Sequence, residues 1–464
     1  MLIRIFSCII LIFSFSCRNE DTARPNIILI NVDDLGWKDV GFMGTDFYET
    51  PHIDALSNSG MVFTNGYASA SNCAPSRASL MTGKWSPRHG IYTVGSSERG
   101  KSQNRRLIPI ENTVTLRKDQ ITIPEILKAN GYSTCHAGKW HLSDNPNDRG
   151  FDVNIGGGHN GHPASYYPPY KNVNLEPEND ENLTDLIMSK TIDYIKSSTS
   201  PFFINYAPYA VHTPIQPITR LVNKYENKPH KTGQSNAGYA TMIENLDRNI
   251  GLLISALKDK GVLDNTLIIF TSDNGGLLGI TNQKPLRAGK GSYYEGGIRV
   301  PFAFVWNGVI EPSINETPIT NIDLFPTLLE VIGFEDEYEY DGQSLLKQLL
   351  GQGQGTDAKI RPLFWHFPIY LQAYKNGNTQ NRDTLFRTRP GSVIRYGDWK
   401  LHHYYEDDGY ELYNLEKDIG EERNLVDEYP EKAAELVQLL NEWRKKTNAP
   451  VPTRLNPEYV PIDN

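Results

Sequence analysis

Two uninterrupted apolar runs constrain the fold of this chain more than any other feature. Residues 26–32 (NIILINV) and 267–272 (LIIFTS) are almost continuously apolar, whereas a strand with one face in water would alternate with polar residues. Helix-length segments lie between them, at 123–130 and 239–258, and the second repeats apolar residues at helical spacing. Strands that alternate with helices predict an α/β fold with a large mixed, mostly parallel sheet sandwiched by helices.

Polar side chains follow both strands directly. Asp33 and Asp34 come after the first strand, and Asp273 and Asn274 come after the second. Ligands of parallel sheets bind beyond the carboxyl ends of the strands, so we expect these side chains to share a site. All four offer oxygen, which favours a hard cation such as Ca²⁺ or Mg²⁺ over Zn²⁺. The alternative is that both segments are ordinary turns that end a strand.

The C-terminal part of the chain has a different pattern. After about residue 355 the sequence continues with short alternating segments and one amphipathic helix, which predict a small antiparallel sheet plus helix. The segments are 392–395, 399–404 and 411–415, and the helix covers 430–446. We therefore predict a catalytic domain at 24–355 and a C-terminal subdomain with its tail at 356–464.

The N-terminus carries features of an export signal. Residues 1–17 (MLIRIFSCIILIFSFSC) place one arginine before an apolar run that is too short to span a bilayer. We predict a signal peptide at 1–17 and a bacterial protein in the periplasm or at the cell surface. Cys17 ends a loose lipobox that lacks the usual leucine three residues earlier, so a lipid anchor at Cys17 and plain cleavage are both open alternatives.

The remaining cysteines are Cys73 and Cys135, because Cys8 and Cys17 belong to the export segment. In an oxidising compartment the pair could form a disulfide. Cys135 otherwise fits a small buried apolar residue. The context of Cys73 indicates a different role.

Overall charge argues against one class of partner. The formal net charge is -9, which is not typical of a protein that binds nucleic acid. A negative protein can still bind an anionic substrate where a few cations converge in one cleft. The local arrangement of Lys, Arg and His therefore decides which anions can bind.

Residues 71–83 (SNCAPSRASLMTG) are the most informative stretch. They resemble the motif of the type I, formylglycine-dependent sulfatases of the alkaline-phosphatase-like superfamily, in which Cys-x-Pro-Ser-Arg opens a short helix ending in Thr-Gly. In that family a formylglycine-generating maturation enzyme converts the cysteine to 3-oxoalanine (Cα-formylglycine), whose hydrate attacks sulfur. The resemblance implies that Cys73 is the nucleophile precursor and that Arg77 holds its hydroxyl and a metal-bound carboxylate. A buried cysteine before a helix is the alternative.

Three further segments match the family in the same order. They are 138–142 (GKWHL), 207–214 (APYAVHTP) and 289–301 (GKGSYYEGGIRVP). By resemblance, Lys139 and Lys290 bind the sulfate, and His141 takes a proton from the hydrate. His212 protonates the departing alcohol, which is a poor leaving group without that proton.

The resemblance also implies a bound metal. Ca²⁺ is the usual ion of the family, and the implied ligands are Asp33, Asp34, Asp273, Asn274 and the matured Cys73. Such an ion polarises the sulfate oxygens. The matches run from about residue 26 to 302, and the segments 397–401 (GDWKL) and 411–415 (ELYNL) look like the family's C-terminal subdomain. The whole chain thus resembles a sulfuric ester hydrolase, similar to bacterial polysaccharide sulfatases.

The sequence predicts the substrate less specifically than it predicts the reaction. Aromatic segments at 166–170 and 364–370 fit stacking surfaces for sugar rings, or equally ordinary core packing. Polar groups that fit contacts with sugar hydroxyls or a uronic acid are His159, Asn160, His162 and His366. With export, these features favour oligosaccharides of an algal polysaccharide such as ulvan or carrageenan, then glycosaminoglycans, then small aryl sulfates. Phosphate ester hydrolysis and a non-catalytic sulfated-glycan binding protein are the alternatives.

Overall fold

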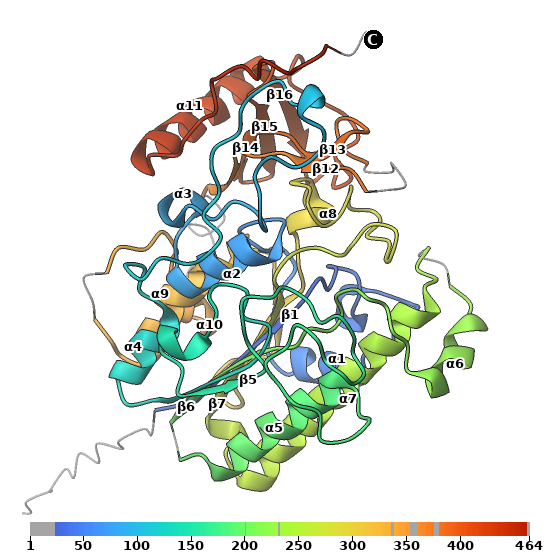
Figure 1. Ribbon diagram of the computed structural model, residues 1–464. Coiled ribbons are helices and arrows are strands. Elements are labelled where there is room, and N and C mark those ends of the chain that lie inside the picture. Colours follow the sequence, from blue (N-terminus) through green and yellow to red (C-terminus); the bar gives the residue numbers. More distant parts are fainter. Residues whose placement is uncertain are drawn as a thin grey trace, which may run out of the picture.

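A computed structural model describes residues 24–199, 201–230, 233–335, 338–352, 361–374 and 380–461 (Figure 1). The predicted signal segment with Cys17, and the predicted domain boundary at residue 355, lie outside these residues. Within the described part of the chain, no helix combines the length and the apolar character needed to cross a bilayer.

The described residues form a main sheet of eight strands in the order β5-β4-β6-β1-β7-β8-β2-β9. The strands are β1 (Asn26–Val32), β2 (Met61–Phe63), β4 (Ser133–Gly138), β5 (Val153–Ile155), β6 (Phe202–Ala207), β7 (Thr266–Ser272), β8 (Phe302–Val305) and β9 (Ser313–Asn315). All neighbours are parallel except β8, which is antiparallel to β7 and β2. The predicted mixed, mostly parallel sheet is confirmed.

The central strand β1 is buried on both faces. Ile28 and Ile30 belong to one hydrophobic cluster, whereas Ile27 and Leu29 belong to another on the opposite face. This explains the continuous apolar run, because successive side chains of a strand point to opposite sides. Helices contribute to both clusters and cover the two faces (Figure 1). One face has α1 (Pro51–Asn58), α5 (Leu183–Ser197) and α7 (Ala237–Lys260), and the other has α2 (Cys73–Thr82), α4 (Ile123–Ala129) and α9 (Leu324–Val331).

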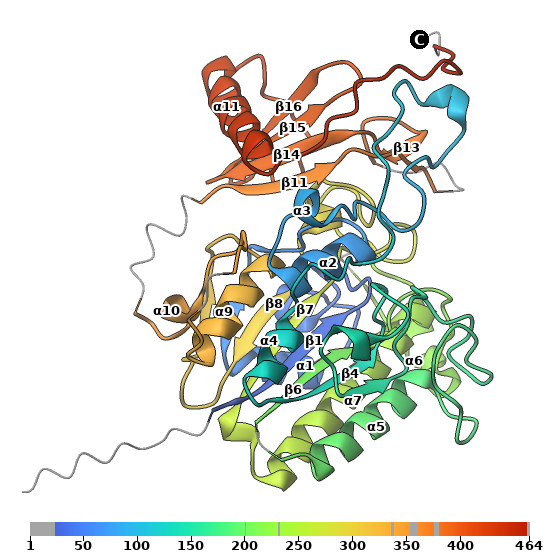
Figure 2. The ribbon, with the colours of Figure 1, turned by 60° about the vertical axis from the view of Figure 1, so that its left-hand side comes forward.

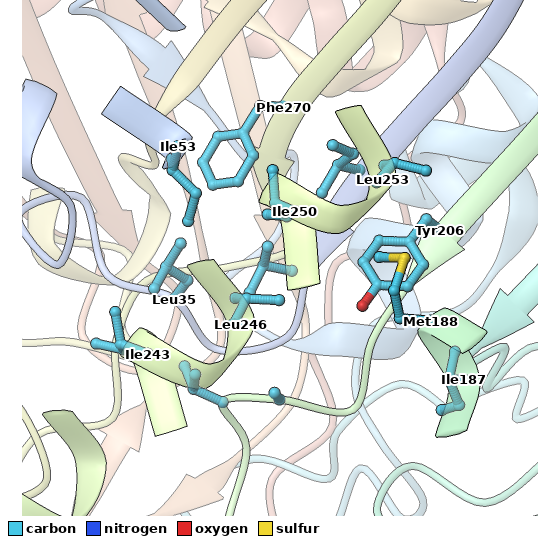
Figure 3. Close-up of a cluster of buried hydrophobic side chains, with 14 of the residues drawn as sticks. Leu35, Ile53, Ile187, Met188, Tyr206, Ile243, Leu246, Ile250, Leu253 and Phe270 are labelled. Atoms are coloured by element: carbon cyan, nitrogen blue, oxygen red, sulfur yellow. The ribbon is translucent and has the colours of Figure 1, made fainter. Parts of the chain in front are cut away.

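Helix α7 shows how the sequence determines such a covering element. The Asn236 side chain accepts a hydrogen bond from the Tyr239 amide at the helix start, and Gly261 ends the helix with a φ of 75°. These two caps explain why the helix extends slightly beyond the predicted 239–258. Its buried residues Ile243, Leu246, Ile250 and Leu253 share a cluster with Ile53, Tyr206 and Phe270 (Figure 3). Burial of each such side chain stabilises the fold by about 1.5–3 kcal/mol.

A second, antiparallel sheet has the strand order β11-β14-β15-β16. Its elements are β11 (Leu363–Phe367), β14 (Gly391–Tyr396), β15 (Trp399–Tyr404), β16 (Gly409–Asn414) and the helix α11 (Pro430–Lys446). Leu436 and Leu440 of α11 are fully buried in the same cluster as Val393 and Leu401, so the helix packs on this sheet (Figure 2). The prediction of a small C-terminal antiparallel sheet plus helix is confirmed.

Shorter elements complete the described part of the chain. They are β3 (Gly66–Tyr67), β10 (Ile319–Thr320), β12 (Leu371–Gln372), β13 (Phe386–Thr388), α3 (Ser86–His89), α6 (Val222–Glu226), α8 (Glu295–Ile298) and α10 (Leu346–Leu349). The pair β12 and β13 is antiparallel and lies beside the larger antiparallel sheet in Figure 1, as β13 does in Figure 2. It contributes to the wall of the pocket described below.

Of the two predicted roles of the aromatic segment at 364–370, the structure supports core packing and not sugar stacking. Phe364, Trp365 and Phe367 are buried core residues, and most of the segment forms strand β11. His366 is also buried, and its ring nitrogens contact the Ser392 hydroxyl and the Pro450 carbonyl. From the sequence alone, this aromatic core strand could not be distinguished from an aromatic surface that stacks on sugar rings.

Candidate active site

The ends of β1 and β7 bring the predicted metal ligands together. The two strands pair in register from Asn26–Thr266 to Val32–Ser272, so the residues that follow them emerge at the same edge. The Asp34 amide donates to Asp273 Oδ1 at 3.2 Å, and Asn274 Nδ2 donates to Asp34 Oδ1 at 2.9 Å. Asp33, Asp34, Asp273 and Asn274 are all buried. Four side chains separated by up to 241 positions thus form one group of oxygen ligands.

Three cations neutralise the carboxylates of this group. Lys139 Nζ lies 2.8 Å from both oxygens of Asp33, and Lys290 Nζ lies 2.6 Å from Asp34 Oδ1. Arg77 Nε lies 2.8 Å from Asp273 Oδ2. We call this group the strand-end cluster, and its members are Asp33, Asp34, Asp273, Arg77, Lys139 and Lys290. Its three carboxyl groups each lie within ion-pair distance of one of its three cations.

The carboxylates of the strand-end cluster are not equivalent. Burial raises the pKa of Asp33 to about 8, because the nearby Asp273 and Asp34 offset part of the attraction to Lys139. Burial acts on Asp34 as well, but Lys290 and His212 outweigh it and lower the pKa of that carboxyl. Buried carboxylates that approach one another are costly unless further positive charge joins them. The cluster therefore has the electrostatic character of a cation site.

Cys73 begins α2 and faces this cluster. Its Sγ lies 3.2 Å from Lys290 Nζ and 3.9 Å from Asp34 Oδ1. The helix holds Arg77 one turn further on, and it ends at Gly83, where φ is 67° and an added Cβ would lie 2.6 Å from Phe325. The Thr-Gly end of the motif thus closes the helix that presents Cys73.

The thiol of Cys73 is a poor nucleophile as it stands. Burial raises its pKa to about 11, despite Lys139 and Lys290 nearby, so the neutral thiol prevails near neutral pH. Cys73 and Cys135 are both free, so the disulfide that the sequence left open does not form. Cys135 is fully buried in a hydrophobic cluster, as the packing interpretation of this residue predicted.

Two histidines border the same site. His212 Nε2 lies 3.6 Å from Asp34 Oδ2, and its Nδ1 lies 2.7 Å from the Thr213 carbonyl oxygen. Since a carbonyl only accepts, Nδ1 carries the hydrogen, and the Nε2 of the neutral ring is free to take a proton. Burial and Lys290 lower the pKa of His212 to about 3, and burial holds the pKa of His141 well below its usual range. Both rings are therefore neutral in this state.

A pocket of about 650 Å³ opens above the cluster. Of the predicted site residues, those that line it are Asp34, Cys73, His141, His212 and Lys290, together with His159, Asn160 and His162. Arg77, Lys139, Asp33, Asp273 and Asn274 are buried behind this wall. The pocket leads from the surface to Cys73 and has room for more than a sulfate group.

The aromatic segment at 166–170 does not line this pocket, which favours packing, the second of its two predicted roles. Tyr166 is 1% exposed, and its hydroxyl donates to the carbonyls of Tyr209 and His212, at 2.6 and 2.8 Å. The segment thus supports the backbone of His212 and does not stack on a ligand. Pocket residues that the sequence analysis missed are Arg99, Tyr374 and Arg387, which lie outside every recognised motif.

The fold and this site define a hydrolase of sulfuric esters, and the chain belongs to the sulfatase family. The Sulfatase family model matches residues 25–334, and a model for the N-sulphoglucosamine sulphohydrolase C-terminal region matches residues 289–448. The interpretation as a type I sulfatase of the alkaline-phosphatase-like superfamily is therefore confirmed.

Individual relatives agree with this assignment. A sulfatase of Formosa agariphila is 34% identical over 95% of this chain and 92% of its own length. Human N-acetylgalactosamine-6-sulfatase is 31% identical over 74% of this chain and 68% of its own length. The crystal structure of Ps i-CgsB in complex with k-i-k-neocarrahexaose has a TM-score of 0.74 and 31% identity, and covers 90% of this chain and 92% of its own.

Proposed function

We propose that this sulfatase hydrolyses sulfate esters of a sulfated oligosaccharide, using Cys73 matured to Cα-formylglycine and a Ca²⁺ ion. The observation that carries the proposal is the position of Lys290, whose Nζ lies 3.2 Å from Cys73 Sγ and 2.6 Å from Asp34 Oδ1 in one pocket. A nucleophile precursor, an anion-binding cation and a metal-ligand carboxylate thus meet at one point.

The residues present fit a hard divalent cation. Ligand atoms of Asp33, Cys73 and Asp273 lie within 4.8 Å of one another, and Asn274 Oδ1 is buried with no hydrogen-bond partner among the described residues. Three carboxylates and an amide oxygen are typical of Ca²⁺ ligands. We infer that Asp33, Asp34, Asp273, Asn274 and the matured Cys73 hold the ion, which when bound polarises the sulfate oxygens.

The cations of the strand-end cluster then become available to the substrate. With a divalent cation bound, all three carboxyl groups would be ionised and would offset the three cations of the cluster, so the bound ion would leave an excess of two positive charges. Lys290, which lines the pocket, can turn from Asp34 to an anionic sulfate group. Preorganised positive charge of this kind stabilises the negative charge of the transition state.

His212 is placed to protonate the leaving oxygen. Its Nε2 points to the Asp34 side of the pocket while the Thr213 carbonyl fixes the ring through Nδ1. Burial and then Lys290 lower the pKa of His212, and an anionic sulfate ester bound at Lys290 would offset the Lys290 part, which favours a protonated Nε2 that can donate to the leaving oxygen. His141, whose Nδ1 has no partner among the described residues, lines the pocket, and we assign it as the base that takes the second hydroxyl proton of the hydrate so that sulfate can leave.

The substrate class rests on relatives and on pocket size. Ps i-CgsB was crystallised in complex with k-i-k-neocarrahexaose and is 31% identical in sequence to this chain. The pocket of about 650 Å³ has room for a sugar unit beside the sulfate. We propose oligosaccharides of a sulfated algal polysaccharide such as ulvan or carrageenan as substrates, ahead of glycosaminoglycans and aryl sulfates, and the likeness to Ps i-CgsB supports carrageenan.

The test is sulfate release from defined oligosaccharides. The chain is expressed with a formylglycine-generating enzyme, and peptide mass spectrometry establishes the residue at position 73. Ion chromatography then measures sulfate from ulvan and carrageenan oligosaccharides, with Cys73→Ala as the blank. Sulfate from the wild type alone supports the proposal and selects the glycan. A fully matured protein that releases phosphate from phosphate esters but sulfate from none of these sugars would contradict it.

We also propose that the protein is exported and acts in the periplasm or at the cell surface. The support is the sequence of residues 1–17, with its single arginine and short apolar run. Fractionation of cells that express the full chain tests this proposal. A mature N-terminus at Cys17 carrying lipid would select the anchored form, whereas recovery of the intact chain in the cytoplasm would contradict export.

A further inference from the structure

Two arginines line the active-site pocket without an acidic partner among the residues that the structure describes. Arg99 lies in the segment between α3 and α4, and Arg387 lies in β13. Arg99 Nε donates to Gln372 Oε1 at 3.0 Å, and Arg387 Nε donates to the Gln372 carbonyl oxygen at 2.9 Å. Both guanidinium groups are thus fixed by neutral acceptors of one residue and lie near each other.

The arrangement is unfavourable without an anion. Both side chains are partly buried, and burial together with the positive charge of Arg387 lowers the pKa of Arg99. Neighbouring arginines are neutralised, since Arg382 pairs with Asp407 and Arg389 pairs with Glu406. Arg99 and Arg387 therefore remain as two like charges at the pocket. The arginines before and after Arg387 in the sequence are each paired with a carboxylate.

Arg387 is also coupled to the sulfate site. Its guanidinium carbon lies 4.0 Å above the ring of Tyr374, and its Nη1 lies 3.5 Å from the carbonyl oxygen of Lys290. The Tyr374 hydroxyl donates to the same carbonyl. The Lys290 side chain reaches Cys73 and Asp34. Lys290 therefore lies between the two pocket arginines, which approach its backbone, and the strand-end cluster, which its side chain joins.

We propose that Arg99 and Arg387 form a subsite for a second anionic group of the substrate, a sulfate ester or a uronate carboxylate on the sugar chain. The inference rests on the proposed function, because it requires that the sulfate to be cleaved lies at Cys73. Guanidinium groups recognise carboxylate and sulfate oxygens through paired hydrogen bonds. The two arginines would make the enzyme prefer sugars with a second negative charge over sugars whose only negative charge is the sulfate to be cleaved.

The test compares matched substrates. Sulfate release is measured from an oligosaccharide with one sulfate at the cleaved position, from the same sugar with a second sulfate, and from the same sugar with a uronate. We expect Arg99→Gln and Arg387→Gln each to lower the preference for the doubly charged sugar, as a ratio of kcat/KM values, by about 10–100-fold. The arm whose preference falls identifies the anion. Arg99→Lys should restore part of the preference.

Arg106→Gln is the matched control, because Arg106 is an exposed neighbour that does not line the pocket. It should leave the ratio as in the wild type. An unchanged ratio in both pocket variants would overturn the subsite. Failure of the wild type to release sulfate from any sugar would instead overturn the proposed function. In that case the subsite is tested by calorimetry. Kd values of the doubly charged sugars are compared between the Cys73→Ala protein and the same protein with Arg99→Gln or Arg387→Gln added.

Discussion

Two buried groups of charged side chains in this protein differ in the arrangement of their charges and in their access to a pocket. The strand-end cluster opens to a pocket, whereas a second group lies sealed between α8 and β15. We call the second group the closed cluster, and its members are Glu295, Arg299, Lys400, His402 and Glu421. Lys400 Nζ lies 2.9 Å from both Glu295 Oε1 and Glu421 Oε1, and all three side chains are fully buried. Both groups are charged and buried, yet only the strand-end cluster opens to the large pocket described above.

The arrangement of signs distinguishes them. In the closed cluster Lys400 stands between the two carboxylates, and Glu295 also pairs with Arg299 at 3.3 Å. Burial would raise the pKa of Glu295, but Lys400 and Arg299 outweigh it and lower that pKa to about 2. In the strand-end cluster adjacent carboxylates converge, and the pKa of Asp33 rises to about 8. Alternating buried charges satisfy one another, so removal of one partner destabilises the fold, whereas converging carboxylates leave binding capacity for a cation.

The largest expected effect is loss of the nucleophile in the open cluster. Cys73→Ala should lower kcat for sulfate release by about 10⁴-fold or more, since covalent catalysis has no substitute for the missing group. Sulfate release from an oligosaccharide is the measurement. Cys135→Ala is the matched control, because this cysteine packs in the core, and it should keep kcat while losing some stability. Equal kcat values for Cys73→Ala and the wild type would contradict the assignment.

Breaking the closed cluster should affect folding instead. Lys400→Met removes the cation between Glu295 and Glu421 and leaves two buried carboxylates close together. We expect the free energy of unfolding to fall by about 3–5 kcal/mol. Urea titration followed by fluorescence measures it. Lys417→Met, at an exposed lysine, should change stability little. A Lys400→Met protein as stable as the wild type would show that the closed cluster is not structural.

Removal of the general acid should have a smaller, substrate-dependent effect. His212→Gln should lower kcat for a sugar sulfate by about 10²–10⁴-fold, because an alkoxide leaves poorly without a proton. The loss should be smaller for an aryl sulfate, whose phenolate needs less protonation. The ratio of the two losses is the measurement. Identical losses for both substrates would assign His212 to binding.

Acidic pH should weaken the closed cluster in a narrow range. The folded pKa of Glu295, about 2, lies below its ordinary value of 4.5, so its ion pairs stabilise the fold above pH 4.5. This contribution is lost as the pH falls from 4.5 toward 2. Unfolding free energies measured across this range should fall less steeply in Glu295→Gln than in the wild type. Parallel curves would contradict the assigned pairing.

The sequence predicted those parts of the protein that depend on local pattern. The run at 26–32 forms β1 and the amphipathic segment at 430–446 forms α11 with the predicted ends. The group around Cys73 could also be anticipated, because acidic residues end two strands that pair in a parallel sheet. Periodicity and strand-end position are properties of neighbouring residues, so they can be recognised without the tertiary structure.

Features made by distant contacts could not be predicted in this way. Arg99 and Arg387 are separated by 288 positions in the sequence. Arg387 comes beside Gln372 because β12 pairs with β13, and Arg99 comes beside it because Glu98 forms a bridge with Tyr370. His366 has the residue type of a ligand-binding group, but its surroundings in β11 make it a core residue. Charge and residue type do not show whether a side chain faces a pocket or a sealed interface. The closed cluster, which no motif marked, illustrates the same point.

The most direct test of the difference between the two clusters pairs one carboxylate from each. Sulfate release per folded molecule is measured for Asp34→Asn and Glu421→Gln, with urea unfolding of the same preparations as the control for stability. We predict that Asp34→Asn loses about 10²–10³-fold or more in kcat/KM with little change in unfolding free energy. Glu421→Gln should keep its rate and lose stability. An Asp34→Asn enzyme with wild-type turnover, or a Glu421→Gln protein that is stable but inactive, would contradict the account.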